Sequence, residues 1–207
     1  MFLRTILWLG VALLLQACSS TPGKRISVAV ETYPPDLPVV TRAEWGWQPL
    51  ERTLPEHEIS RVTIHHGGVE VGEEKDIVAY LKNLQSWSRS EKGWIDIPYH
   101  YIIDLQGKIY EARPLAYPGD TNTSYDPRGH ALISVIGNYE VQKIQPAQID
   151  ALARLSAWLI ARYELGLDAL ASHRDYAPGE TVCPGADLYR LLQDGSLKRL
   201  VSVYLGK

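Results

Sequence analysis

One short segment near the end of the chain concentrates the residue types that do chemistry. Residues 172–185 read SHRDYAPGETVCPG, in which Cys183 follows His173 by ten positions. The prolines and glycines of this segment exclude the interior of a regular helix or strand, so we expect a loop. Cys183 has no partner for an intramolecular disulfide if Cys18, the only other cysteine, is accounted for by the N-terminal pattern described below. From this segment alone, Cys183 is a buried apolar side chain, a nucleophile or a metal ligand.

A pair of histidines supplies the other candidate ligand. His65 and His66 follow the run RVTI and precede two glycines, a pattern that predicts a strand ending at the histidines. Neighbouring side chains on a strand point to opposite faces, so only one of the two histidines can face a given site. That imidazole, His173 and a Cys183 thiolate make three ligands, which suits a catalytic zinc whose fourth position is left to water. If His173 and Cys183 were absent, the simpler interpretation of the adjacent pair would be one surface histidine and one hydrogen-bonded core histidine.

The periodicity of the sequence predicts the elements that must position these residues. Apolar residues at three-and-four spacing indicate helices, and short β-branched or apolar runs bounded by glycine indicate strands. The predicted elements are a helix over 73–87, strands over 99–104, 108–111 and 132–136, a helix over 146–165, and a last helix from about 187, interrupted near 194–195. Their order indicates a single α/β domain with a mixed central β-sheet and helices on both faces. The loop 115–129 is a candidate wall for a ligand groove.

The N-terminus has the pattern of an export signal. Residues 1–17, MFLRTILWLGVALLLQA, combine one arginine with an apolar run that ends in a small residue. This pattern predicts a signal peptide that is too short for a membrane span. The residues before Cys18 resemble a bacterial lipobox, which implies a lipid on Cys18 and a membrane anchor. Ser19 resembles the residue that sorts such lipoproteins to the outer membrane, facing the periplasm. A plain secretory signal or an uncleaved anchor is the alternative.

The rest of the chain divides into a spacer and one domain. Three prolines between positions 34 and 38 favour extended geometry, so we expect 18–41 to be a lipidated N-terminus and an extended tether. Residues 42–207 then form one domain with room for a real core. The formal net charge of −3 provides no basic field for nucleic acid. We therefore expect no nucleic-acid partner. We also expect a monomer.

Six short motifs in this chain carry a family resemblance. In order they are RAEWG, VTIHHG, PYHYIID, ISVIGNY, SHRD and TVCPG, spread from about residue 41 to residue 192. This window resembles the zinc-dependent N-acetylmuramoyl-L-alanine amidase family, which also includes peptidoglycan recognition proteins and phage amidase lysozymes. The resemblance covers about three quarters of the chain. It implies the fold of that family and a hydrolase that cleaves the amide bond between N-acetylmuramic acid and L-alanine in peptidoglycan or its fragments.

The resemblance also implies roles for individual residues. One zinc ion per chain would be held by His65, His173 and Cys183, with catalytic support from Tyr99 and Thr181. Zinc lowers the pKa of bound water to about 7, and hydroxyl groups such as those of Tyr99 and Thr181 can stabilise the oxyanion that forms on attack. Without the resemblance, Tyr99 would be interpreted as a half-buried strand aromatic.

Two other functions remain open. A recognition protein would bind muropeptides without cutting them, and such relatives typically lose the cysteine ligand that this chain has. A structural lipoprotein would use zinc to hold a loop shut, and a structural site usually has a fourth protein ligand. His66 and His100 are the nearby candidates for that ligand, and strand alternation is expected to turn both away from the site.

A few residues keep two interpretations. Family members often have Gly-x-His where this chain has Gly119, Asp120 and Thr121, so that histidine is missing. Arg174 and Asp175 are expected to be structural, with an orienting role of Asp175 toward a ligand imidazole as the alternative. Three aromatic side chains could line a sugar-binding groove or pack in the core; these are Trp94, Tyr117 and Tyr125.

Overall fold

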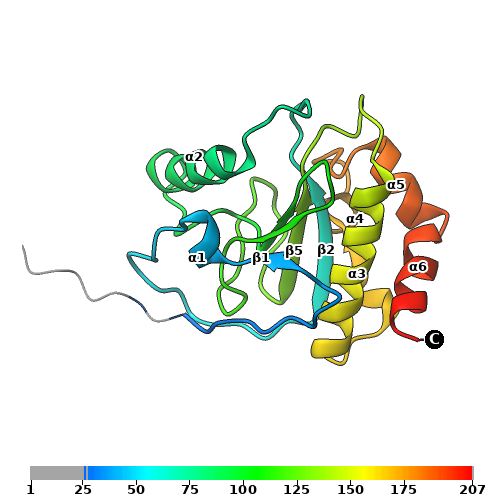
Figure 1. The fold of residues 1–207 in the computed structure, drawn as a ribbon, viewed down its shortest axis with the longest axis horizontal. Coiled ribbons are helices and arrows are strands. Elements are labelled where there is room, and N and C mark those ends of the chain that lie inside the picture. Colours follow the sequence, from blue (N-terminus) through cyan, green and yellow to red (C-terminus); the bar gives the residue numbers. More distant parts are fainter. Residues whose placement is uncertain (1–25, 27, 207) are drawn as a thin grey trace, which may run out of the picture.

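The computed structural model describes residue 26 and residues 28–206 (Figure 1). The predicted signal peptide and the predicted lipid attachment site at Cys18 lie outside the described residues. Within the described residues, no helix combines the length and the apolar character needed to cross a membrane.

A six-stranded mixed sheet forms the centre of the molecule, with strand order β1-β4-β3-β5-β2-β6. The strands are β1 (Val39–Val40), β2 (Arg61–His66), β3 (Tyr101–Ile103), β4 (Ile109–Glu111), β5 (His130–Val135) and β6 (Leu170–Ser172). Only β3 and β4 pair antiparallel, and the other neighbours are parallel. The central strand β5 is buried along its whole length, which agrees with its nearly unbroken apolar sequence. The predicted mixed sheet is confirmed.

Helices cover both faces of this sheet, as predicted (Figure 1). They are α1 (Arg42–Trp45), α2 (Ile77–Ser90), α3 (Pro146–Arg162), the 3-10 helix η1 (Leu167–Ala169), α4 (His173–Tyr176), α5 (Ala186–Gln193) and α6 (Ser196–Tyr204). The larger core cluster joins one face of the sheet to α3, α5 and α6. A smaller cluster joins the other face to α1 and α2, through buried residues such as Trp45, Leu81 and Ile102. The burial of apolar side chains on both faces is the main favourable term that holds the layers together.

One of the predicted helix boundaries shifts in the structure, and another is confirmed. The helix predicted from residue 73 begins at Ile77, because the carboxylate of Asp76 accepts the backbone N–H of Ala79 at 2.9 Å and caps it. The predicted interruption of the last helix near 194–195 is confirmed, because Gly195, whose φ of 72° is left-handed, separates α5 from α6.

The loop predicted over 172–185 was wrong in one part, because its first residues form the short helix α4. The side chain of Asp175 accepts hydrogen bonds from the backbone N–H of Ser172 at 2.8 Å and from its hydroxyl at 2.6 Å. This capping box supports one helical turn before Pro178 follows.

The described part of the predicted tether packs against the domain. Leu37 is buried in the larger core cluster, and Val39–Val40 pair with β4. The Tyr33 hydroxyl donates to the buried carboxylate of Glu111 at 2.6 Å, and Arg162 lies 2.6 Å from the carboxylate of Glu31. The packed unit therefore begins before residue 42, earlier than predicted, because this proline-containing segment carries apolar side chains that the core can bury.

Candidate metal centre

The first half of the centre is formed by His65 and Cys183. His65 is the fifth residue of the central strand β2 and is 2% exposed, and Cys183 is 7% exposed. The Cys183 Sγ lies 3.7 Å from Nδ1 of His65 and also accepts the backbone N–H of His66 at 3.4 Å. The sulfur therefore faces one imidazole of the pair and the main chain of the other.

The register of the sheet brings in the third residue. Strand β6 is parallel to β2, and Ser172 pairs with Ile64. His65, still within β2, and His173, the first residue after β6, therefore lie at the same end of neighbouring strands, and their ring centroids are 4.5 Å apart. One ligand atom from each of His65, His173 and Cys183 lies within 4.8 Å of the other two. The structure thus assembles the three residues that the sequence singled out as metal ligands.

The protonation states of the two histidines suit a metal. Burial holds the pKa of His65 well below its usual value and lowers the pKa of His173 to about 4. Both imidazoles are therefore neutral at pH 7, which is the form that binds metal. Two nitrogen donors and one sulfur donor in a buried cluster match the donor chemistry of a zinc site with three protein ligands.

The environment of Cys183 does not suit a free nucleophile. Burial raises the pKa of the Cys183 thiol to about 12, so the thiol is protonated at pH 7 without a cation beside it. A protonated thiol is a poor nucleophile, whereas metal binding would remove its proton. The nucleophile interpretation therefore has no support in this geometry. A ligand role agrees with the two neutral imidazoles that face the sulfur.

The centre opens into a polar cavity of about 310 Å³. Its walls come from four segments of the chain, around residues 65–68, 94–99, 120–123 and 173–183. Tyr99 and Thr181 both line it. The Tyr99 ring lies 5.2 Å from the His65 ring between centroids, and burial raises the pKa of Tyr99, so its hydroxyl stays protonated. The Thr181 Oγ1 accepts the backbone N–H of Cys183 at 3.1 Å.

Two hydroxyl groups lie beside the candidate ligand imidazoles. Thr123 lines the cavity and was missed by sequence reasoning, whereas Tyr125, a predicted groove aromatic, is not among the residues that line it. Thr123 Oγ1 lies 2.7 Å from Nε2 of His173, and the hydroxyl of Tyr125 lies 3.4 Å from Nε2 of His65. These side chains come from the loop that was predicted as a groove wall, where the family histidine is absent. The missing histidine was a signal that this loop differs from the family pattern, but the sequence did not show which of its hydroxyl groups lie beside the ligand imidazoles.

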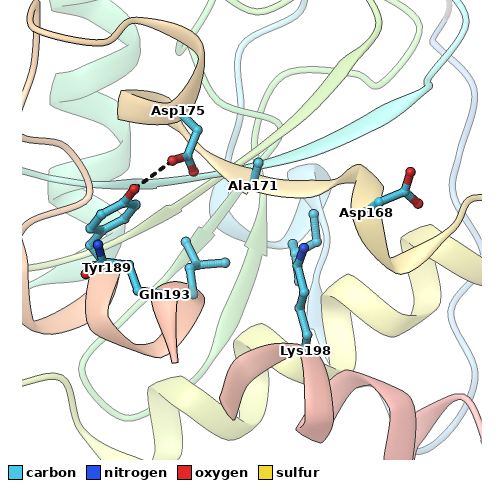
Figure 2. Close-up of a pocket in the computed structure, with 8 residues that line it drawn as sticks. Asp168, Ala171, Asp175, Tyr189, Gln193 and Lys198 are labelled. Carbon is cyan, nitrogen blue, oxygen red and sulfur yellow. Dashed lines mark hydrogen bonds between the residues drawn. The ribbon is translucent and has the colours of Figure 1, made fainter. Parts of the chain in front are cut away.

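Asp175 does not orient a ligand imidazole. Besides capping α4, its carboxylate accepts a hydrogen bond from the Tyr189 hydroxyl at 2.8 Å (Figure 2). It borders a separate cavity with Asp168 and Lys198. Arg174 stacks on the Tyr189 ring at 4.4 Å. The structural interpretation of both residues agrees with these contacts, because the capping bond turns the Asp175 carboxylate back toward Ser172.

The remaining candidates divide between cavity and core. Trp94 lines the cavity, whereas Tyr117 is buried in a small core cluster with Leu50 and Ile95. His66 borders the cavity but is not one of the three converging ligands, and its Nδ1 accepts the backbone N–H of Tyr139 at 3.2 Å. His66 is therefore outside the three converging ligands, as the resemblance implied. The expectation that strand alternation turns it away from the site was wrong, because His66 borders the same cavity.

Fold and site together define an α/β protein with a candidate metal centre at the carboxyl ends of its parallel strands. A comparison with family models makes this class specific. The model described as N-acetylmuramoyl-L-alanine amidase matches residues 55–186, and the chain belongs to this family.

Individual relatives agree with this membership. Peptidoglycan-recognition protein SD of Drosophila simulans is 32% identical over 175 residues, which cover 76% of this chain and 86% of that protein. The endolysin of Enterobacteria phage T3 is 30% identical over 121 residues, or 56% of this chain and 77% of the endolysin. The solved structure of peptidoglycan recognition protein-LE in complex with tracheal cytotoxin, a monomeric diaminopimelic acid-type peptidoglycan, has a TM-score of 0.65 and 26% identity; the match covers 75% of this chain and 92% of that one.

Proposed function

We propose that this protein is a zinc-dependent amidase that cleaves the bond between N-acetylmuramic acid and L-alanine in peptidoglycan or its fragments. The observation that carries the proposal is the convergence of His65, His173 and Cys183 at a cavity that Tyr99 and Thr181 also line. In this proposal the three converging residues hold one zinc ion per chain. When bound, zinc supplies hydroxide at neutral pH and polarises the carbonyl under attack.

The hydroxyl groups of Tyr99 and Thr181 share one task in this mechanism. Tyr99 keeps its proton because burial raises its pKa, so it can donate to the oxygen on which negative charge develops. The Thr181 oxygen already accepts the N–H of Cys183, which leaves the hydroxyl proton free to point into the cavity. Both groups are then donors to the oxyanion, each worth about 2–4 kcal/mol of transition-state stabilisation.

Peptidoglycan as the substrate is supported by the relatives. One of them is named for peptidoglycan recognition, and another is solved with a peptidoglycan fragment. The export signal and the lipobox-like residues before Cys18 support a place in the cell envelope, as an outer-membrane lipoprotein that faces the periplasm. Fractionation of cells that express wild type and Cys18→Ala tests the anchor; wild type found only in the soluble periplasmic fraction would contradict it.

The decisive experiment incubates zinc-loaded protein with purified peptidoglycan and analyses the products by mass spectrometry. We expect free stem peptides with an N-terminal L-alanine. Tyr99→Phe removes a donor to the oxyanion and no metal ligand, so turnover should fall by about 10²–10³-fold while zinc content is unchanged.

The other outcomes distinguish the alternatives. Intact muropeptides that bind without release of peptides would identify a recognition protein. New reducing sugar ends without free peptides would identify glycosidase chemistry. Released peptides together with a fully active Tyr99→Phe variant would leave the amidase in place and contradict the role of Tyr99.

A further inference from the structure

Two threonine hydroxyls lie beside Nε2 of the His173 imidazole. Thr123 Oγ1 is 2.7 Å and Thr121 Oγ1 is 3.3 Å from Nε2 of His173. Both residues belong to the loop in which the family histidine is missing, and neither is one of the three converging ligands. The contact therefore joins an exposed loop to a single nitrogen of a candidate ligand.

The threonine pair is itself held in place. The backbone N–H of Thr123 donates to Thr121 Oγ1 at 3.1 Å, and the two Oγ1 atoms lie 2.8 Å apart. Because Thr121 Oγ1 accepts the backbone N–H of Thr123, the hydroxyl proton of Thr121 is available for donation to Thr123 Oγ1. The Thr123 oxygen is then an oriented acceptor beside Nε2 and does not depend on a freely rotating hydroxyl.

The same loop is fastened to the segment that carries the thiol. The carboxylate of Glu180 accepts the backbone N–H of Ser124 at 2.8 Å and also accepts the Ser124 hydroxyl. Glu180 lies three residues before Cys183. The acceptor for His173 and the sulfur of the centre are therefore joined by a short chain of contacts, which limits how far the threonines can move from the imidazole.

We propose that Thr123, supported by Thr121, is a positioning residue that orients His173 and keeps the proton on Nε2, so that Nδ1 is the atom that binds the metal. A neutral imidazole has one N–H and one lone pair, and a partner that accepts the N–H of one nitrogen leaves the lone pair on the other. Groups that hold a ligand imidazole in this way typically change metal affinity by about 10–100-fold when removed. The inference rests on the zinc site of the proposed function but not on the amide cleavage.

Zinc affinity of the full chain tests the inference without an activity assay. Competition against a chromophoric chelator should show about 10–100-fold weaker zinc binding for Thr123→Val, which replaces the hydroxyl by a methyl of similar size. Thr123→Ser keeps an oxygen and should restore most of the affinity. Nitrogen-15 NMR of the zinc-loaded wild type should show the His173 proton on Nε2.

Thr63→Val is the matched control. Thr63 Oγ1 lies 2.8 Å from Nδ1 of His130, so the same kind of bond is removed from a buried histidine that is not one of the converging ligands. This variant should lose thermal stability and bind zinc as the wild type does. Unchanged zinc affinity in Thr123→Val, or an equal loss in Thr63→Val, would overturn the proposal. A wild type that binds no zinc would overturn the metal centre as well, whereas zinc binding without peptide release would contradict the amidase alone.

Discussion

Two regions of the molecule use their histidines in opposite ways. At the two ends of the loop 115–129, His57 and His100 are bonded to the main chain through both ring nitrogens. Nδ1 of His57 accepts the N–H of Gly129 at 2.8 Å, and its Nε2 donates to the Leu115 carbonyl at 2.9 Å. Nδ1 of His100 accepts the N–H of Leu132 at 2.8 Å, and its Nε2 donates to the Tyr117 carbonyl at 3.0 Å. These two imidazoles act as cross-links between the start and the end of the loop.

At the candidate metal centre the imidazoles have side-chain partners only, within the part of the chain that the structure describes. Nε2 of His65 faces the Tyr125 hydroxyl, Nε2 of His173 faces Thr123, and Nδ1 of His65 faces the sulfur of Cys183. Burial lowers the pKa in both regions, to about 3 for His100 and to about 4 for His173. A lowered pKa therefore does not distinguish a ligand from a structural histidine. The two regions differ in that the main chain occupies both ring nitrogens of His57 and His100, whereas it occupies neither ring nitrogen of His65 or His173 among the described contacts.

The largest expected effect is the loss of zinc from the candidate metal centre. Cys183→Ser replaces a thiolate by a neutral hydroxyl, which is a poor zinc ligand, so tight zinc binding should be abolished. Elemental analysis of the purified variant measures this directly. His66→Ala is the control and should retain one zinc per chain, because His66 is not among the converging ligands. Undiminished zinc in Cys183→Ser would contradict the assigned centre.

The second expected effect is a loss of folding stability when a histidine that cross-links the loop 115–129 is replaced. His100→Leu keeps an apolar side chain of similar size but leaves the buried N–H of Leu132 and the carbonyl of Tyr117 without their partner. Each unpaired buried group costs about 1–3 kcal/mol, so the free energy of unfolding should fall by about 2–6 kcal/mol. Urea unfolding in the presence of a chelator measures this cost. The folded variant should still bind zinc stoichiometrically, and loss of the metal would show that the two regions are not independent.

The smallest effect is a dependence of stability on pH. The usual pKa of histidine, about 6.5, describes the unfolded chain, whereas burial lowers the pKa of His100 to about 3 in the folded protein. Between these values the unfolded chain binds more protons than the folded one, so the free energy of unfolding decreases as the pH falls. His100 alone should contribute a decrease of about 2 kcal/mol between pH 7 and pH 5.

Urea unfolding of zinc-free protein at both pH values tests this contribution. His100→Leu should show a pH dependence that is smaller by about the same amount. An equal dependence in wild type and variant would mean that His100 is not buried as a neutral group.

Local sequence patterns predicted much of the fold. The run RVTIHHGG predicted β2 and its end at His66, and the apolar spacing of 146–165 predicted α3 to within three residues of its C-terminal end. These patterns are local because side chains alternate every two residues in a strand and recur every 3.6 residues in a helix. The packing of residues 28–41 was missed because extended, proline-containing segments have no periodicity that shows a buried face.

The sequence by itself determined which residue types were available for a metal centre, and the family resemblance selected His65, His173 and Cys183 among them. The tertiary structure decided how they meet. Parallel pairing of Ile64 with Ser172 sets His65 beside His173, and the hydrogen bond to Tyr189 draws Asp175 away from the centre. Thr123 contacts a residue 50 positions away in the chain. Such contacts depend on sheet register and loop path, and no local spacing determines either of them.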